Sequence, residues 1–204
     1  KCILVEGNVD MVMMHQLGLR NVVAPCGTAL TAEQVHLIHR FTEDLTIMFD
    51  GDAAGIKAAL AKIDMVLEEG LNVRIVLLPE GEDPDSFCRT HTLEEVKGYI
   101  DGHEQDFVSF KTDMLLGDAQ NDPIRKANLI NDIADTIAAI PDAVKRSVYV
   151  EMVSGKFNVD SNILFNRISE KRQRMITERK LAEDRARRRQ EAELPPLPEE
   201  GYFP

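Results

Sequence analysis

One stretch of the sequence, residues 46–55, reads Thr46-Ile47-Met48-Phe49-Asp50-Gly51-Asp52-Ala53-Ala54-Gly55. An apolar run bounded by glycine is typical of a buried strand. This run ends in two carboxylates that are one residue apart. Open α/β sheets bind their ligands outside the carboxyl ends of the strands. The stretch therefore predicts a buried strand that delivers acidic side chains to one edge of a sheet.

The same pattern occurs at two other places in the chain. The apolar run Cys2–Val5 leads into Glu6, and the apolar run at residues 73–78 leads into a segment that holds Asp83 and Asp85. Three strands that each end in acid predict one shared acidic pocket. Clustered carboxylates repel one another, so the pocket needs a cation. Oxygen ligands of this kind suit Mg²⁺ or Mn²⁺.

The first hundred residues alternate apolar runs with helical patterns, which predicts an α/β fold with a parallel sheet flanked by helices. We expect strands at residues 2–5, 21–24, 45–49 and 73–78, and helices at residues 9–17, 31–41 and 53–69. Capping boxes begin at Thr31 and Thr92. The strands are apolar throughout, as expected when helices cover both faces of the sheet. In the second of these helices, Phe41 is expected to turn inward with Val35 and Ile38.

The remainder of the chain is helical in pattern and predicts a small all-α part. Helices are expected at residues 105–116, from Asp122 to Pro141, around residues 144–152, and from a cap at Ser161. The helix expected from Asp122 to Pro141 has Ile124 at the start of its apolar stripe. We divide the chain at residues 1–101, 102–168 and 169–204, the last being a solvated helix and a loose tail.

The composition indicates a globular protein of a reducing compartment. The 204 residues are 44% hydrophobic, which is enough to bury a core, and no window predicts a membrane span or a signal peptide. Three cysteines without a C-x-x-C pair argue against a disulfide framework or a zinc site. The net charge is −11, but residues 171–190 hold nine Lys/Arg and three Asp/Glu, so the rest is near −17. An acidic body binds nucleic acid poorly on its own.

The acids have simpler explanations as well as a chemical one. Asp50 and Asp52 can hold a divalent ion together, with Glu6 completing the shell or acting as general acid/base. A metal held in this way can carry phosphates, which indicates phosphoryl transfer. Alternatively, Asp50 or Asp52 caps the helix expected from residue 53. The segment Asp83–Asp85 can likewise be a helix start.

Small residues at Gly27 and Thr28 leave two interpretations open. They follow the short strand at residues 21–24, where a turn needs no further role. They would also let the backbone approach a phosphate closely. Asp10, four residues after Glu6, is either an outer member of the acidic set or a solvated or capping acid.

At these residues the chain resembles the Toprim domain of primases, topoisomerases and some nucleases. The motifs are most similar to those of the bacterial DNA primase family, in order and in spacing. They are Val5-Glu6-Gly7-x-x-Asp10, Gly27-Thr28-Ala29-Leu30-Thr31, Phe49-Asp50-Gly51-Asp52-x-Ala54-Gly55 and Leu78-Pro79-x-Gly81-x-Asp83-Pro84-Asp85. They cover about residues 1–100, and the helical part to about residue 168 resembles the end of the primase polymerase core. Asn8-Val9 and Pro25-Cys26 depart from the pattern without removing a carboxylate.

The resemblance implies a DNA-templated RNA polymerase that makes short primers. It implies that Glu6, Asp50 and Asp52 are catalytic and that they bind Mg²⁺ or Mn²⁺ together with Asp83. Asp10 and Asp85 are implied as supporting acids. Contacts to a nucleotide or phosphate are implied for Gly27, Thr28 and Lys57.

The resemblance also implies partners and neighbouring domains. The partners are a single-stranded DNA template, ribonucleoside triphosphates and the replicative helicase, in the bacterial cytoplasm at the replication fork. Zinc is expected only in an N-terminal domain upstream of Lys1, which would be followed by a basic half of the polymerase core. The helicase is expected to bind a domain beyond residue 204, with residues 171–190 as the linker toward it. The chain itself is expected to be monomeric and nearly inactive alone.

Other classes of protein share parts of this pattern. A Toprim nuclease has the glutamate and the Asp-x-Asp pair but is not expected to carry the whole pattern around Gly27 and Asp83. A topoisomerase needs a tyrosine nucleophile, and Tyr99, Tyr149 and Tyr202 lie outside the motifs. A non-enzymatic Toprim interaction module need not keep the full acidic set.

Overall fold

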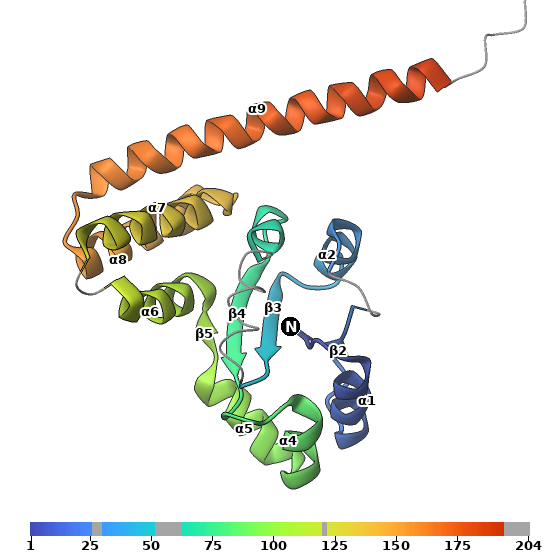
Figure 1. The fold of residues 1–204 in the computed structure, drawn as a ribbon. Helices are drawn as coiled ribbons and strands as arrows, with labels where there is room; N and C mark the ends of the chain where they lie inside the picture. Colours follow the sequence, from blue (N-terminus) through green and yellow to red (C-terminus); the bar gives the residue numbers. More distant parts are fainter. Residues whose placement is uncertain (26–29, 52–62, 120–121, 194–204) are drawn as a thin grey trace, which may run out of the picture.

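The computed structural model describes residues 1–25, 30–51, 63–119 and 122–193, and Figure 1 shows their arrangement. Five strands form one sheet in the order β2-β1-β3-β4-β5. Their bounds are Cys2–Leu4 (β1), Val22–Val23 (β2), Asp44–Phe49 (β3), Asn72–Leu77 (β4) and Gln105–Asp106 (β5). The first four strands are parallel, and β5 is antiparallel to β4. The predicted α/β class is confirmed.

Strand β5 was not predicted, because the sequence pattern predicted a helix that begins at residue 105. Arg74 pairs with Asp106 and Ile75 pairs with Gln105. Two polar residues carry no alternating pattern, so only the neighbouring strand identifies them as part of the sheet. This short strand ends the sheet and leads directly into the helical part of the chain.

The helices of the sheet part begin and end where local signals predict. They are Asn8–Leu17 (α1), Ala32–His39 (α2), Pro84–Thr90 (α4) and Leu93–His103 (α5). Gly18 ends α1 in the left-handed conformation, with φ at 118°, which glycine adopts at little cost. Both predicted capping boxes are present, at Thr31 and Thr92. Residues 63–68 are also helical.

Four further helices form the rest of the described chain. They are Phe107–Ala119 (α6), Pro123–Ala139 (α7), Ala143–Phe157 (α8) and Ser161–Glu193 (α9). At the start of α9 the backbone N–H of Asn162 donates to Asp160 at 2.7 Å, so Asp160 acts as the cap in place of the predicted Ser161. Within the described residues, no helix is both long and apolar enough to cross a membrane.

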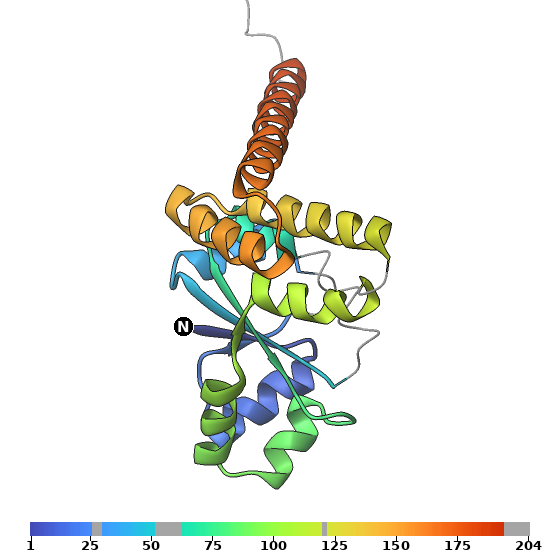
Figure 2. The ribbon, with the colours of Figure 1, turned by 90° about the vertical axis from the view of Figure 1, so that its left-hand side faces the viewer.

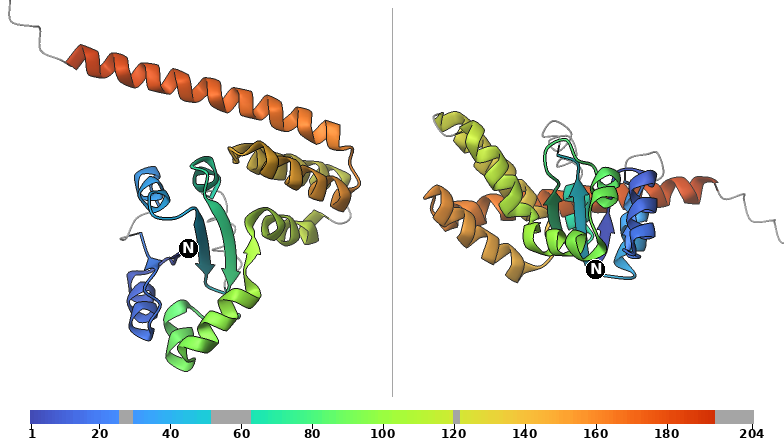
Figure 3. Two further views of the ribbon diagram at one scale, coloured as in Figure 1. Left: turned by 180° about the vertical axis from the view of Figure 1, so that it is seen from behind. Right: turned by 90° about the horizontal axis from the view of Figure 1, so that it is seen from below.

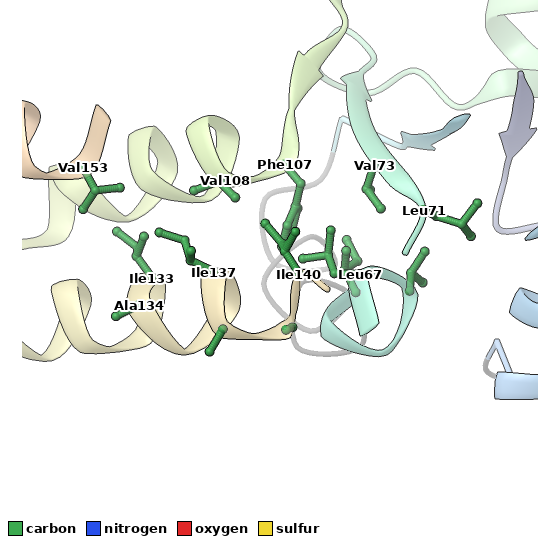
Figure 4. Close-up of a cluster of buried hydrophobic side chains, with 14 of the residues drawn as sticks. Leu67, Leu71, Val73, Phe107, Val108, Ile133, Ala134, Ile137, Ile140 and Val153 are labelled. Carbon is green, nitrogen blue, oxygen red and sulfur yellow. The ribbon is translucent and has the colours of Figure 1, made fainter. Parts of the chain in front are cut away.

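Each face of the sheet has its own apolar core. Met48 and Val76 lie on one face and pack with Met14 of α1, Phe87 of α4 and Val96 of α5. The other face packs against the helical part in a single cluster, to which β3, β4 and α6 to α9 all contribute. Figure 4 shows Leu67 and Val73 of the sheet part continuing into Phe107, Ile137 and Val153. The helical part therefore shares its core with the sheet.

Two predicted inward positions are wrong. Phe41 is 82% exposed and Ile124 is 72% exposed. Ile124 lies in the first turns of α7, where residues 123–128 are all exposed, and the buried stripe of this helix starts only at Leu129. Helical spacing identifies which residues share a face, but it does not say how far along the helix the neighbouring elements cover that face.

A buried lysine joins the helical part to the residues that follow the Asp-x-Asp segment. Lys111 of α6 is only 5% exposed, and its ammonium group donates to Thr136 Oγ1 at 2.8 Å and lies 3.1 Å from Asp132. Burial raises the pKa of Asp64, on the helix at residues 63–68, while the charge of Lys111 opposes that shift. A buried ammonium needs such partners, so these groups fix how α6 and α7 sit against residues 63–68.

We predict that the two isoleucines of α7 differ sharply in their contribution to stability. Ile137→Ala removes a fully buried side chain and should lower the free energy of unfolding by about 2–5 kcal/mol. Ile124→Ala makes the same chemical change at an exposed position of the same helix and should stay within about 0.5 kcal/mol. Urea denaturation followed by circular dichroism measures both, and equal losses would contradict the described packing.

Candidate metal-binding site at the carboxyl edge of the sheet

The register of three parallel strands brings the predicted acids to one edge. Leu4 of β1 is paired with Ile47 of β3, and Phe49 is paired with Leu77 of β4. Glu6 and Asp50 therefore follow neighbouring strands at the same end. In Figure 1 the arrowheads of β3 and β4 point toward the end of the sheet where α1 and α4 lie. This placement is the one that the sequence predicted.

A close backbone contact joins the loop after β3 to the loop after β4. The Gly51 N–H donates to the carbonyl of Glu82 at 3.1 Å, and the Leu78 N–H donates to Phe49 at 3.1 Å. A Cβ atom at Gly51 would lie 2.3 Å from the carbonyl oxygen of Pro79. Only glycine fits there without moving the backbone. The contact holds Asp50 beside the segment that leads to Asp83.

Asp10 ties the loop after β1 to the start of α4. Its Oδ2 accepts the Gly7 N–H at 3.0 Å, and its Oδ1 accepts the Asp85 N–H at 3.3 Å. Burial raises the pKa of Asp10, and the charges of Asp83 and Asp85 add to this effect, while the two backbone hydrogen bonds oppose it. Asp10 is thus a structural brace between two acid-bearing loops, and its role as a supporting acid of a metal site stays a prediction.

The segment Asp83–Asp85 starts a helix, as the simpler interpretation had it. Asp83 Oδ1 accepts the Ser86 N–H at 2.7 Å, and Pro84 occupies the first turn of α4. Asp85 pairs with Arg89, whose Nε lies 2.9 Å from Asp85 Oδ1. The cap uses one carboxylate oxygen of Asp83. Metal binding by Asp83 therefore stays a prediction beside this structural role.

Two neighbours of the acids were not singled out from the sequence. Arg89 lies four residues after Asp85, a spacing that allows an ion pair along a helix and was therefore visible in the sequence. Cys88 is buried beneath the same turn, and burial, with the charges of Asp85 and Asp10, raises the pKa of its thiol to about 11. Cys88 therefore stays protonated near neutral pH and behaves as a core residue.

The described part of the edge holds carboxylates, and their chemistry fits Mg²⁺ or Mn²⁺. Glu6 and Asp83 are exposed, and Asp50 is partly buried. Within the described residues, no three His, Cys, Asp or Glu side chains are gathered closely enough to hold an ion. Asp52, Gly27, Thr28 and Lys57 lie outside those residues. The structure thus brings Glu6, Asp50 and Asp83 to one edge without forming a complete ligand set.

Two family models match this chain. A family described as Toprim-like matches residues 3–88, which contain all four motifs that carry the resemblance. A family described as the DnaB-helicase binding domain of primase matches residues 108–162, from α6 to the start of α9. From the sequence, a helicase-binding domain was expected only beyond residue 204. The second match lies within the helical part instead.

Curated proteins and solved structures give the same picture. A DNA primase of Clostridium acetobutylicum is 30% identical over 82% of this chain and 28% of its own length. The crystal structure of the Aquifex aeolicus primase, with its zinc binding and RNA polymerase domains, is 34% identical with a TM-score of 0.66 over 80% of this chain and 38% of that chain. A structure of the DnaG primase catalytic domain bound to ssDNA is 26% identical with a TM-score of 0.67, covering 76% and 51%. The chain thus spans about a quarter of the curated relative's length.

We predict that Gly51→Ala disrupts the acidic edge. The added Cβ would overlap the Pro79 carbonyl, and because that atom is backbone it cannot move as a flexible side chain can. We expect a loss of about 1–3 kcal/mol in the free energy of unfolding, together with weaker Mn²⁺ binding. The matched control is Gly98→Ala in α5, where a Cβ meets nothing within 4 Å.

Gly98→Ala should stabilise the helix by about 0.5–1 kcal/mol and leave Mn²⁺ binding unchanged. Thermal unfolding with and without Mn²⁺ separates the two variants. A Gly51→Ala protein as stable as wild type would show that the two loops are not in contact.

Proposed function

We propose that this chain, which belongs to the bacterial DnaG-type DNA primase family, is the metal-binding part of a polymerase core that makes RNA primers on a DNA template. The observation that carries the proposal is the acidic edge, where Glu6, Asp50 and the loop before Asp83 leave three neighbouring parallel strands. Because the chain spans only part of its relatives, the activity is proposed for the whole protein to which it belongs.

The proposed ligands of Mg²⁺ or Mn²⁺ are Glu6, Asp50, Asp52 and Asp83. When bound, such an ion neutralises phosphate charge and stabilises the attacking and leaving oxygens of nucleotidyl transfer. Glu6 is exposed at the end of β1 and can face the reacting groups. Asp10 keeps the Glu6 loop against α4 through its two backbone hydrogen bonds. Asp85, paired with Arg89, supports the same turn.

The proposed partners follow from the family and from two of the relatives. One solved relative is a primase catalytic domain bound to ssDNA, which supports a single-stranded DNA template. The match to a DnaB-helicase binding domain supports the replicative helicase as a partner, with residues 108–162 as its proposed contact. Ribonucleoside triphosphates, a monomeric state and a cytoplasmic location at the replication fork remain parts of this proposal. Zinc would belong to a neighbouring domain, as in the Aquifex relative.

The second family match also bears on the alternatives. A Toprim nuclease or a Toprim interaction module shares the sheet and some of the acids, but a primase-specific helicase-binding segment is expected only of a primase. The match therefore favours primase over both alternatives.

We predict that the acidic edge binds Mn²⁺. Asp50→Asn/Asp52→Asn should lose most of the binding heat in a calorimetric titration and most of the thermal stabilisation that Mn²⁺ gives wild type, because an ion that binds only the folded state raises its stability. Glu94→Gln/Glu151→Gln removes the same charge from exposed positions on α5 and α8 and should bind like wild type. Equal Mn²⁺ binding by wild type and both double variants would contradict the proposed metal site.

We predict that Glu6→Gln in the full-length primase lowers primer synthesis by about 100-fold or more. Glu6 is exposed and the change preserves its size, so the fold should be kept. Asp85→Asn should have a milder effect, because Asp85 supports a turn. Template-directed incorporation of ribonucleotides measures both, with Glu94→Gln as the control. Near wild-type yield from Glu6→Gln would overturn its assignment as a catalytic residue.

A further inference from the structure

The C-terminal half of α9 is a basic helix that extends away from an acidic body. Figures 1 and 2 show α9 passing α7 and α8 and continuing beyond them, and Figure 3 shows the same from behind and below. This part of the chain follows both family matches, the later of which ends at residue 162. From residue 171 to residue 190 basic residues outnumber acidic ones by nine to three, while the rest of the chain is near −17.

The first half of α9 is held firmly by the body. Leu164 and Ile168 are buried in the shared core. Asp135 of α7 pairs with Arg167 at 3.2 Å and with Lys171 at 3.0 Å. These contacts fix the direction of the first half of the helix, and the residues beyond them continue the same helix.

Arg172 completes this anchor at the end of α7. Its Nη1 donates to the carbonyl oxygens of Ala138 and Ile140, both at 3.0 Å. Arg146 of α8 donates to the same Ile140 carbonyl at 2.8 Å. Arg172 and Lys171 are therefore committed to structure, and the basic residues available to a partner lie further along α9.

The second half of α9 leaves the body and presents arginines on one side. Arg179 is the last residue of α9 with a described electrostatic contact to the sheet part, through Glu68, and residues 176–188 are all exposed. Arg174, just before this half, and Arg185 and Arg188, which lie 11 and 14 residues after it, fall within a narrow sector of the helix. Glu178, four residues after Arg174, lies next to them. The three arginines span about 21 Å at 1.5 Å per residue. Leu181, 51% exposed, lies between them on the same side.

We propose that this face of α9 binds the phosphodiester backbone of a nucleic acid. The occupant follows from charge: a guanidinium recognises phosphate through paired N–H groups, whereas the rest of the chain carries a net charge near −17. The exposed acids of this half are partly engaged within the helix, since Glu183 pairs with Arg179 and Asp184 pairs with Arg187. This binding surface is separate from the acidic edge and does not depend on the proposed chemistry.

The size of the effect follows from counterion release. Each phosphate neutralised contributes about 0.7 to the slope of log K against log salt for single strands and about 0.9 for duplex DNA. Three arginines then give about 2 for single strands. Binding through them should weaken about 20-fold between 50 mM and 200 mM salt.

The test is fluorescence anisotropy of a labelled 20-nucleotide single strand, and of its duplex, with the 204-residue chain. The variant Arg174→Gln/Arg185→Gln/Arg188→Gln keeps helix propensity and removes three charges from this face of α9. The control, Arg20→Gln/Arg40→Gln/Lys97→Gln, removes three charges from exposed positions of the body. We expect the α9 variant to bind DNA at least about tenfold more weakly than wild type at 50 mM salt, with a shallower salt dependence. The control variant should bind DNA like wild type.

Circular dichroism should show equal helix content in all three proteins, because none of the six side chains is buried. Comparing the affinities for single-stranded and duplex DNA shows whether this face of α9 prefers a single strand or binds any phosphate backbone. Equally weakened DNA binding in both triple variants would overturn the proposal, since it would mean that binding depends on the net charge of the chain and not on this face of α9. Polyglutamate that displaces DNA at equal charge concentration would also overturn it, in favour of an acidic protein surface.

Discussion

The parallel pairing of β1, β3 and β4 is the constraint on which the rest of this structure depends. Parallel strands bring their carboxyl ends to one edge, so Glu6 and Asp50, which closely follow β1 and β3, lie at that edge. The Gly51 contact with the Pro79 carbonyl then draws two of these loops together. A shift of one residue in either pairing would exchange the two faces of a strand and would place polar Thr46 or Arg74 where Leu45 or Val73 now packs.

The helical part depends on the same sheet. Its core is continuous with the side chains on one face of β3 and β4, and the buried Lys111 places charged groups of α6 and α7 next to Asp64. The segment that matches a helicase-binding family is therefore packed against the helix that follows the Asp-x-Asp segment.

Local signals in the sequence were sufficient for most of the fold. The strands β1, β3 and β4 were predictable because they are apolar on both faces, and the caps at Thr31 and Thr92 were predictable because a capping box is satisfied within one helical turn. The predictions that failed concern residues whose structure depends on neighbours that are distant in the sequence. The two residues of β5 become a strand only beside β4, and Phe41 and Ile124 have the spacing of core residues at places that nothing covers.

The candidate site was predictable to a similar degree. The acids were found at one edge because strand ends are encoded locally. The roles of Asp10 and Asp83 were not, since a carboxylate that caps a helix or braces a loop has the same sequence pattern as a ligand. Asp52 and the residues around Gly27 and Lys57 lie outside the described residues, so their part in the site stays a prediction.

Anomalous scattering from crystals soaked in Mn²⁺ tests directly whether the acidic edge binds metal. We predict an anomalous peak at the carboxyl edge of the sheet, within bonding distance of carboxylate oxygens of Glu6 and Asp50. A peak bound only elsewhere, for example at Asp135 or at the acids of α5, would contradict it. So would the lack of any peak at an Mn²⁺ concentration that saturates binding in solution.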